Sequence, residues 1–310
     1  MENKLHNFDI VIVGFGPVGQ FAANLLDQYN LKVAVIEKSS HIYFKPRANN
    51  LDDEVMRRIS SFNDFKKFKN KTSVPNFIEF NFPNGKNIQS NPVKKTSNGF
   101  PAINMFYQPD LESFFYKNIY YSKKINFFFD NELIDFKENN DQIALTTSSS
   151  DKKTNKILRT KFLLACDGFD SSIRSKLNIG QQDLQYNKDW LIIDVDLNEG
   201  KILDKVARQI CDPDRPTTFL STSKTKHRFE FQLLAGEDAE EMKSNKSINR
   251  LLKVWLEPNE YTIERREVYQ FRAKKADLWK KGNVFLLGDA AHQIPPYAGQ
   301  GLSSGIRDVA

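Results

Sequence analysis

The sequence predicts an α/β fold in which a parallel, doubly wound sheet is assembled from distant stretches of the chain. A second, mixed or antiparallel sheet is inserted between those stretches. Three observations predict this arrangement: residues 9–36 have the pattern of a strand, a helix and a strand, residues 72–100 alternate in the manner of hairpin strands, and the apolar run 284–287 supplies a late strand for the first sheet.

The opening of the chain has the pattern of a βαβ unit. The apolar run 9–13 predicts a strand that ends at Gly14, and residues 20–29 have helical spacing. A second buried strand over residues 31–36 ends at Glu37. Such a unit places its two strands side by side and parallel.

The rest of the chain alternates between the two expected sheets. Residues 52–68 and 110–120 predict helices, and the prolines and alternating aromatics of 72–100 favour an antiparallel hairpin. Further strands are expected at 126–136, 142–147, 157–164, 188–197, 228–234, 262–271 and 284–287, and a further helix at 248–256.

Composition excludes several classes of protein. The 310 residues carry a net charge of +6, and the densest lysine cluster, within residues 66–71, is short and interrupted. This pattern favours a solvated face over a nucleic-acid surface, although a positive field would attract anionic cofactors and carboxylate substrates. Two cysteines and four scattered histidines predict neither a disulfide framework nor a metal site.

Residues 1–9 carry charges and no apolar core, so we expect no signal peptide. No stretch approaches the roughly 20 apolar residues of a membrane span. We therefore expect a cytoplasmic protein without a membrane span. Whether it forms a homo-oligomer stays open.

A glycine-rich turn follows the first strand. Gly14, Gly16 and Gly19 form a GxGxxG pattern in which the first glycine permits the tight turn, the second lets a diphosphate approach, and the third lets helix and strand pack closely. The helix that follows offers its N-terminal amides to phosphate. Glu37, about 20 residues later, is placed to accept hydrogen bonds from a ribose. A tight turn without any ligand is the alternative.

Two later stretches end strands with an aspartate. Asp167-Gly168 follows the strand at 157–164, and there a carboxylate can reach a cofactor, although Ser171 could simply cap a short helix beside it. Gly288-Asp289 repeats this arrangement after the last strand. His292, for which the sequence places no acidic partner, is expected to be structural, with a catalytic role as the weaker alternative.

A proline- and glycine-rich loop at 295–301 completes the pattern. Its small residues allow backbone to lie against a flat ring, and a helix beginning at Gly301 would direct amides at a negative ring edge. Together the three stretches predict FAD, held from three directions by a Rossmann-like domain. We expect this FAD-binding domain to comprise 1–74, 104–180 and 282–310, and the substrate domain to comprise 75–103 and 181–281.

These motifs resemble those of the FAD-dependent aromatic hydroxylases, the single-component flavoprotein monooxygenases of the para-hydroxybenzoate hydroxylase fold. The resemblance rests on the GxGxxG with its distal acid, DGxxSxxR at 167–174 and GDAAHxxPPxxGQG at 288–301. Within that group, residues 47–54, 107–109, 211–216 and 227–231 are most similar to hydroxylases of 3-(3-hydroxyphenyl)propionate.

The resemblance implies a role for each site residue. Gly14, Gly16 and Gly19 would hold the FAD diphosphate and Glu37 the adenosine ribose. Asp167 would lie near both FAD and the nicotinamide cofactor. The remaining implied cofactor contacts are Arg47 and Gln108 from neighbouring loops, Asp289 on the ribityl chain, and Gly299, Gly301 and Leu302 on the isoalloxazine, with Pro296 facing the reacting oxygen.

The implied reaction is hydroxylation of a phenolic acid with NADH or NADPH and O2, through a flavin C4a-hydroperoxide. Arg215 and Arg228 are candidates for binding the substrate carboxylate, with surface arginines as the alternative. A halogenase or reductase of the same fold, or a non-catalytic FAD-binding fragment, is the rival interpretation.

Two departures from the family pattern stand out. Ser303 replaces an asparagine found in many relatives, which we expect to weaken a contact with the flavin ring. The chain ends at Ala310, within the helix expected after the flavin loop. On that basis we expect a fragment of a longer protein.

Overall fold

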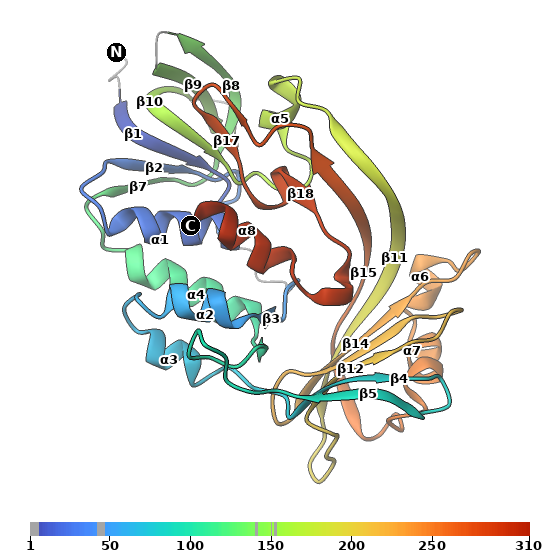
Figure 1. Ribbon diagram of the computed structural model, residues 1–310. Coiled ribbons are helices and arrows are strands. Elements are labelled where there is room, and N and C mark those ends of the chain that lie inside the picture. The colour runs from blue at the N-terminus through green and yellow to red at the C-terminus, as the bar shows by residue number, and fades with distance from the viewer. Residues whose placement is uncertain (1–5, 42–46, 140–141, 150, 152–153) are drawn as a thin grey trace.

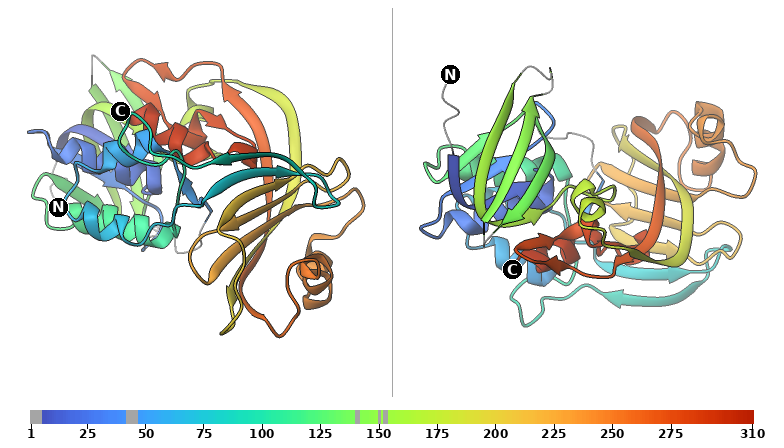
Figure 2. Two further views of the ribbon diagram at one scale, coloured as in Figure 1. Left: turned by 60° about the horizontal axis from the view of Figure 1, so that its bottom comes forward. Right: turned by 90° about the horizontal axis from the view of Figure 1, so that it is seen from above.

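Two eight-stranded sheets form the protein, and the C-terminal segment lies between them (Figure 1; Figure 2). The computed structural model describes residues 6–41, 47–139, 142–149, 151 and 154–310. The α/β fold with a second, largely antiparallel sheet is confirmed.

The first sheet has a parallel centre. β1 is flanked by β10 and β2, and β17 and β7 extend the parallel set on either side. β8 and β9 form an antiparallel extension that pairs with the first half of β10. The strands are β1 (His6–Val13), β2 (Val33–Ile36), β7 (Ile125–Phe128), β8 (Asn131–Asn139), β9 (Gln142–Ser149), β10 (Asn155–Ala165), β16 (Lys280–Lys281) and β17 (Val284–Leu286).

Helices pack on one side of this sheet, and α1 lies against α4 and α8 (Figure 1). A phenylalanine-rich cluster fills the space between the helices and includes Phe21, Phe62 and Phe115. The helices on that side are α1 (Pro17–Asp27), α2 (Asp53–Ile59), α3 (Phe65–Lys69), α4 (Gln108–Ile119) and α8 (Gly301–Val309), with short β3 (Asn50–Leu51) and β6 (Asn104–Met105) beside them. The short helix α5 (Ser172–Lys176) packs on the opposite side, where Ile173 contacts the apolar cluster that contains Val11 and Val13 of β1.

The second sheet is built around two long strands that also reach the first sheet's side of the molecule (Figure 1). β11 and β15 pair along nearly their whole length, and β18 adds the C-terminal segment to the edge of β15. The strands are β4 (Phe77–Asn81), β5 (Asn87–Pro92), β11 (Gln181–Leu197), β12 (Val206–Ile210), β13 (Thr217–Ser221), β14 (Lys226–Gln232), β15 (Tyr261–Ala276) and β18 (His292–Gln293).

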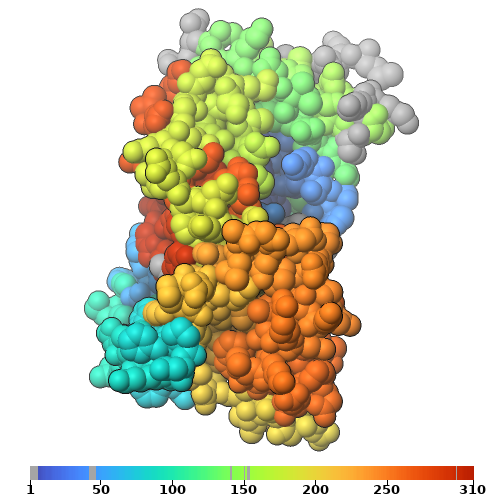
Figure 3. Space-filling model, turned by 90° about the vertical axis from the view of Figure 1, so that its right-hand side faces the viewer, coloured from blue at the N-terminus to red at the C-terminus, as the bar shows by residue number. Residues whose placement is uncertain are grey.

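One face of the second sheet is covered by α6 (Ala239–Met242) and α7 (Asn245–Leu252). Leu191, Ile193 and Val195 of β11 pack on that side, as part of an apolar core. Because side chains alternate along a strand, the residues between them face the other way, towards the first sheet and the C-terminal segment. Figure 3 shows α6 and α7 in orange, and at the waist of the molecule atoms of the blue N-terminal and red C-terminal segments.

The structure corrects two element boundaries. The helix expected over 52–68 is divided into α2, which ends at Ile59, and α3, which begins after Asp64 in a left-handed conformation with φ 58°. The strand expected over 126–136 is likewise broken by Asp130, at φ 54°, into β7 and β8. β12 and β13 were missed by the sequence analysis. The exact domain boundaries stay a prediction.

None of the helices in the described part of the chain has both the length and the apolar character needed to cross a membrane.

The core of the second sheet generates a stability prediction. Phe229 is fully buried, with its ring centroid 5.1 Å from that of Phe219 and 5.3 Å from that of Trp255. Phe229→Ala should lower the free energy of unfolding by about 3–5 kcal/mol through lost burial and a residual cavity. Phe82→Ala, at a side chain that is 45% exposed, should change it by less than about 1 kcal/mol. Urea denaturation of both variants checks this, and equal losses would contradict the assigned core.

Candidate functional site

The glycine-rich turn between β1 and α1 is packed too closely for larger residues at two positions. A Cβ on Gly14, which has φ +94°, would lie 2.3 Å from the carbonyl oxygen of Cys166. A Cβ on Gly19 would lie 2.1 Å from the carbonyl oxygen of Gly14. These two glycines therefore fix the turn against the end of β10, as the sequence predicts for the first and third positions.

Gly16 is different, because a Cβ there would meet no atom of the described residues within 4 Å. Gly16 is the N-cap of α1, and no side chain caps the amides of the helix's first turn. The open space therefore lies where backbone amides and the positive end of the helix dipole are available. This combination fits a diphosphate.

Glu37 lies at the end of β2, beside this turn. Its carboxylate accepts hydrogen bonds from the backbone amides of Phe15 (2.7 Å) and Ser39 (2.8 Å). Each carboxylate oxygen has a second lone pair, so the group can still accept a hydrogen bond from a hydroxyl. The ribose role of Glu37 stays a prediction.

The N-terminal and C-terminal stretches meet at α1. A Cβ on Gly305 of α8 would lie 2.7 Å from a methyl carbon of Val18 and 3.0 Å from Cα of Gly288. Arg307 of α8 forms ion pairs with Asp52 and Glu54 at the start of α2. Segments nearly 300 residues apart in sequence thus form one surface.

The Asp167 stretch joins the same surface. Asp167 Oδ2 accepts from the backbone amide of Ile173 at 3.2 Å, whereas its buried Oδ1 makes no hydrogen bond of good geometry within the described residues. Burial raises the pKa of this carboxyl. Ser171 caps α5, as its alternative interpretation expected. Arg174 donates to the carbonyl oxygen of Ala290 at 2.9 Å and so ties this stretch to the one containing Asp289.

Asp289 combines two properties of a ligand-binding carboxylate. Its side chain is exposed, yet the protein around it raises its pKa by desolvation, while Arg47 acts in the opposite direction. A carboxyl that is accessible but surrounded by protein is placed to be covered by a ligand. The site residue predicted for a ribityl chain therefore lies where a polyol could reach it.

The proline- and glycine-rich loop contains a short turn, Pro296–Ala298, which ends at Gly299 with φ +60°. The expected helix follows as α8, and no side chain caps its first turn. A Cβ on Gly301 would meet no described atom within 4 Å, whereas Leu302 packs against the phenylalanine-rich cluster. This second uncapped helix start fits a negatively charged ligand edge.

Two polar side chains near this loop lie in unexpected surroundings. Ser303 is fully buried, and its hydroxyl has no hydrogen-bond partner among the described residues. His292 has an acidic partner that the sequence analysis missed, because Asp308 Oδ2 lies 2.7 Å from its Nε2 and also accepts from the Gly288 amide at 2.8 Å. The 16-residue separation gave no signal, since only the return of α8 brings the pair together.

Arg47 and Gln108 lie beside the glycine turn and belong to a hydrogen-bonded chain. Gln108 Oε1 accepts from the backbone amides of Arg47 and Ala48, and its Nε2 donates to Glu112 at 2.6 Å. Glu112, missed by the sequence analysis, also accepts from Gln20 of α1 at 3.0 Å. Burial raises the pKa of Glu112 to about 7, although both amides favour its ionised form.

Both candidate substrate arginines are already engaged. Arg215 makes a two-pronged ion pair with Glu237. Arg228 is buried, pairs with Asp194 at 2.7 Å, and donates to the carbonyl oxygen of Arg47 at 2.8 Å. These pairs count against a direct role of either guanidinium in binding a carboxylate.

The face of the second sheet opposite α6 and α7 meets the proline loop. Tyr297 of the loop stacks edge-on against Trp190 of β11 (5.4 Å) and Tyr186 (5.8 Å), and Trp190 donates to the Tyr186 hydroxyl at 3.0 Å. We name these three residues the aromatic trio. Nothing in the local sequence signals it, because it depends on the pairing of β11 with its neighbours.

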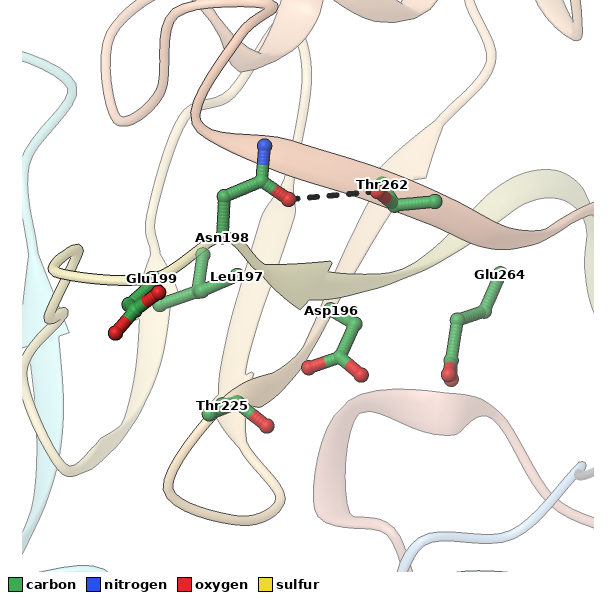
Figure 4. Close-up of a pocket in the computed structure, with 7 residues that line it drawn as sticks. All are labelled: Asp196, Leu197, Asn198, Glu199, Thr225, Thr262 and Glu264. Atoms are coloured by element: carbon green, nitrogen blue, oxygen red, sulfur yellow. Dashed lines mark hydrogen bonds between the residues drawn. The ribbon is translucent and has the colours of Figure 1, made fainter.

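A cavity of about 610 Å³ lies elsewhere on the second sheet, at the end of β11 (Figure 4). Lys226 is paired there with Glu264 and, at 3.7 Å, with Asp196. No glycine-turn, Asp167 or proline-loop residue contributes to its walls, so it is separate from the candidate cofactor site. It is lined by Asp196, Leu197, Asn198, Glu199, Thr225, Thr262 and Glu264.

The chain matches a known protein family over almost its whole length. The FAD binding domain family matches residues 7–310, and the chain belongs to that family. The prediction of FAD as the cofactor is confirmed by this match.

The curated relatives include the 3-(3-hydroxy-phenyl)propionate/3-hydroxycinnamic acid hydroxylase of Escherichia coli K12. It is 29% identical over 305 residues, which are 98% of this chain and 54% of that protein. The corresponding protein of strain O8 IAI1 is 30% identical over 306 residues, with the same coverage of both chains. The chain therefore spans about half the length of these relatives.

Solved structures share the fold. The p-nitrophenol 4-monooxygenase of Pseudomonas putida DLL-E4 has a TM-score of 0.87 at 20% identity, covering 98% of this chain and 78% of that one. Aklavinone-11 hydroxylase in a complex with FAD and aklavinone has a TM-score of 0.82 at 20% identity, covering 98% and 61%.

The glycine turn predicts a contrast between two substitutions. Gly19→Ala should lower the free energy of unfolding by about 3 kcal/mol, because its Cβ would strike backbone. Gly16→Ala should lower it by no more than about 1 kcal/mol but weaken FAD binding at least tenfold, because its Cβ would fill the space a diphosphate needs. Urea denaturation and FAD titration check this. Normal FAD affinity in Gly16→Ala would contradict the assigned position.

Glu112 predicts a pH dependence of stability. Its pKa rises from 4.5 to about 7 on folding, so the folded chain holds the proton more strongly, and stability should fall as pH rises between these values. The change is at most about 3 kcal/mol. Other charges facing Glu112 are Arg47, which opposes the shift, and Glu37, which adds to it.

Urea denaturation between about pH 5 and 7.5 tests this. Glu112→Gln should show a smaller loss of stability over this interval than the wild-type chain, since every other titrating group is common to both. Parallel profiles would show that Glu112 titrates normally.

Proposed function

We propose that this chain is the FAD-binding and substrate-facing part of a monooxygenase that hydroxylates a phenolic aromatic acid, such as 3-(3-hydroxyphenyl)propionate, with NAD(P)H and O2. One observation carries the proposal. The glycine turn, the Asp167 stretch and the 288–301 stretch converge on one surface, which meets the face of the second sheet opposite α6 and α7. The curated hydroxylase relatives support the reaction class.

We assign the FAD contacts from that surface. The α1 amides beside Gly16 would bind the diphosphate, Glu37 the adenosine ribose, and Asp289 the ribityl chain. The α8 amides at Gly301 would lie at the isoalloxazine edge, with Gly299 and Leu302 beside the ring. The two uncapped helix starts and the accessible, desolvated carboxyl of Asp289 support this assignment. Arg47 would complete the binding site on the other side of the glycine turn, with Gln108 holding the backbone amides of Arg47 and Ala48 in place.

Bound FAD supplies the redox chemistry, accepting a hydride from the nicotinamide and activating oxygen. The protein positions the ring system and limits access of water to it. Pro296 would lie next to the reacting oxygen. The aromatic trio offers apolar ring surface where the second sheet meets the loop, which suits an aromatic substrate. Asp167 would lie near both FAD and the nicotinamide cofactor.

The experiment starts from colour, because bound oxidised FAD makes a protein yellow. The purified chain, reconstituted with FAD, should oxidise NADH or NADPH faster when 3-(3-hydroxyphenyl)propionate is present. Oxygen uptake should match nicotinamide oxidation, and mass spectrometry should find one added oxygen atom in the product. Running both nicotinamides in parallel identifies the preferred donor.

Each rival has its own outcome. A colourless protein that FAD cannot reconstitute would indicate a non-catalytic fragment. A yellow protein whose NAD(P)H oxidation does not respond to phenolic acids would favour a non-hydroxylating flavoprotein. Formation of hydrogen peroxide with unchanged substrate would contradict hydroxylation by this chain.

A further inference from the structure

Glu112 lies at the centre of a buried hydrogen-bonded chain that connects two separate loops. It is 1% exposed, and it lies on α4 one turn after Gln108. One carboxylate oxygen accepts from Gln108 Nε2 and the other from Gln20 Nε2. The carboxylate therefore joins two amides that belong to different elements.

Each amide holds a different part of the candidate cofactor site. Gln20 Nε2 also donates to the carbonyl oxygen of Phe15, inside the glycine turn, at 3.0 Å. Gln108 Oε1 accepts from the backbone amides of Arg47 and Ala48, at 2.7 and 2.8 Å. The hydrogen-bonded chain thus runs from the glycine turn to Arg47 and Ala48, which we name the Arg47 segment, and it passes through the single carboxylate of Glu112.

The direction of every hydrogen bond in this chain is fixed. Gln108 Oε1 faces two donors, so its Nε2 must point to Glu112. Gln20 Nε2 faces the Phe15 carbonyl, so it too points a donor at Glu112. Only a group that accepts on both sides completes the chain, and a carboxylate is such a group. An amide at position 112 would place one donor against another.

We infer that Glu112 is a positioning residue for FAD binding, which holds the glycine turn and the Arg47 segment at a fixed separation on either side of the cofactor. This inference rests on the proposed placement of FAD between those segments. It assigns Glu112 no contact with FAD. Burial disfavours the ionised form of Glu112, so a carboxylate at this position lowers the stability of the fold. This cost supports a role for Glu112 other than stabilising the protein.

Exchanging the side chains of Gln108 and Glu112 tests the inference. In Q108E/E112Q, the carboxylate introduced at position 108 would accept from the two backbone amides and from the side-chain amide introduced at position 112. The oxygen of that new amide would in turn accept from Gln20, so every hydrogen bond of the chain is restored. In E112Q alone two donors face each other, and in Q108E alone two carboxylates do.

FAD dissociation constants from fluorescence titration at about pH 8.5, where Glu112 is ionised, are the main readout. E112Q and Q108E should each bind FAD about tenfold more weakly than the wild-type chain, and Q108E/E112Q should return to within about threefold of it. Asn24→Ala is the matched control, because Asn24 also links α1 to α4, through the carbonyl oxygens of Gln20 and Phe115, without bonding to either loop. It should lower the thermal unfolding midpoint while FAD affinity stays within about twofold.

The outcomes separate this inference from the proposed function. Wild-type affinity in E112Q, or a loss that the exchange does not repair, would overturn the positioning role while FAD binding by the protein stands. If E112Q folds poorly, the exchange variant still decides, since it carries the same substitution. A wild-type chain that does not bind FAD would overturn the proposed function, and the positioning role with it.

Discussion

The close packing of α1 against the C-terminal segment is the constraint on which the rest of the structure depends. Val18 lies against Gly288 and Gly305, and the glycine turn in front of it touches the end of β10 through Gly14. Side chains at these glycines would push the stretches apart. Because only hydrogen atoms occupy these positions, three distant parts of the chain can place backbone amides and carboxylates around one space.

The second sheet is attached to that space by polar bonds as well as by aromatic contacts. Arg228 takes part in an ion pair with Asp194 and also binds the Arg47 carbonyl, so the orientation of the sheet and the path of the cofactor-side segment are linked. Tyr297 makes a second connection, because its ring joins the proline- and glycine-rich loop to Trp190 of the second sheet. Desolvation offsets much of the attraction in a buried charge pair, so this pair adds little to stability while its hydrogen bonds orient the two segments.

The sequence predicted what local spacing controls. The glycine pattern, the two strand-terminal aspartates and the helix at Gly301 are contiguous motifs, and each lies in the expected type of element. The partners Asp308 and Glu112 were missed, because their significance arises only when α8 and α4 pack beside the site. Arg228 was chosen for its charge alone. Its pairing with Asp194 follows from the register of β14 on β11, which no short segment encodes.

The length of β11 and β15 has a mechanical consequence. These two strands are hydrogen-bonded to each other from Gln181–Ala276 at one end to Leu197–Tyr261 at the other, and they pass from the neighbourhood of α5 to the far sheet as one curved ribbon (Figure 1). A ribbon of this kind resists bending, since rotation of one half against the other would break ladder bonds. The two halves should therefore move as a unit, so that the part of the ribbon beside α5 and the part in the far sheet keep a fixed relative orientation.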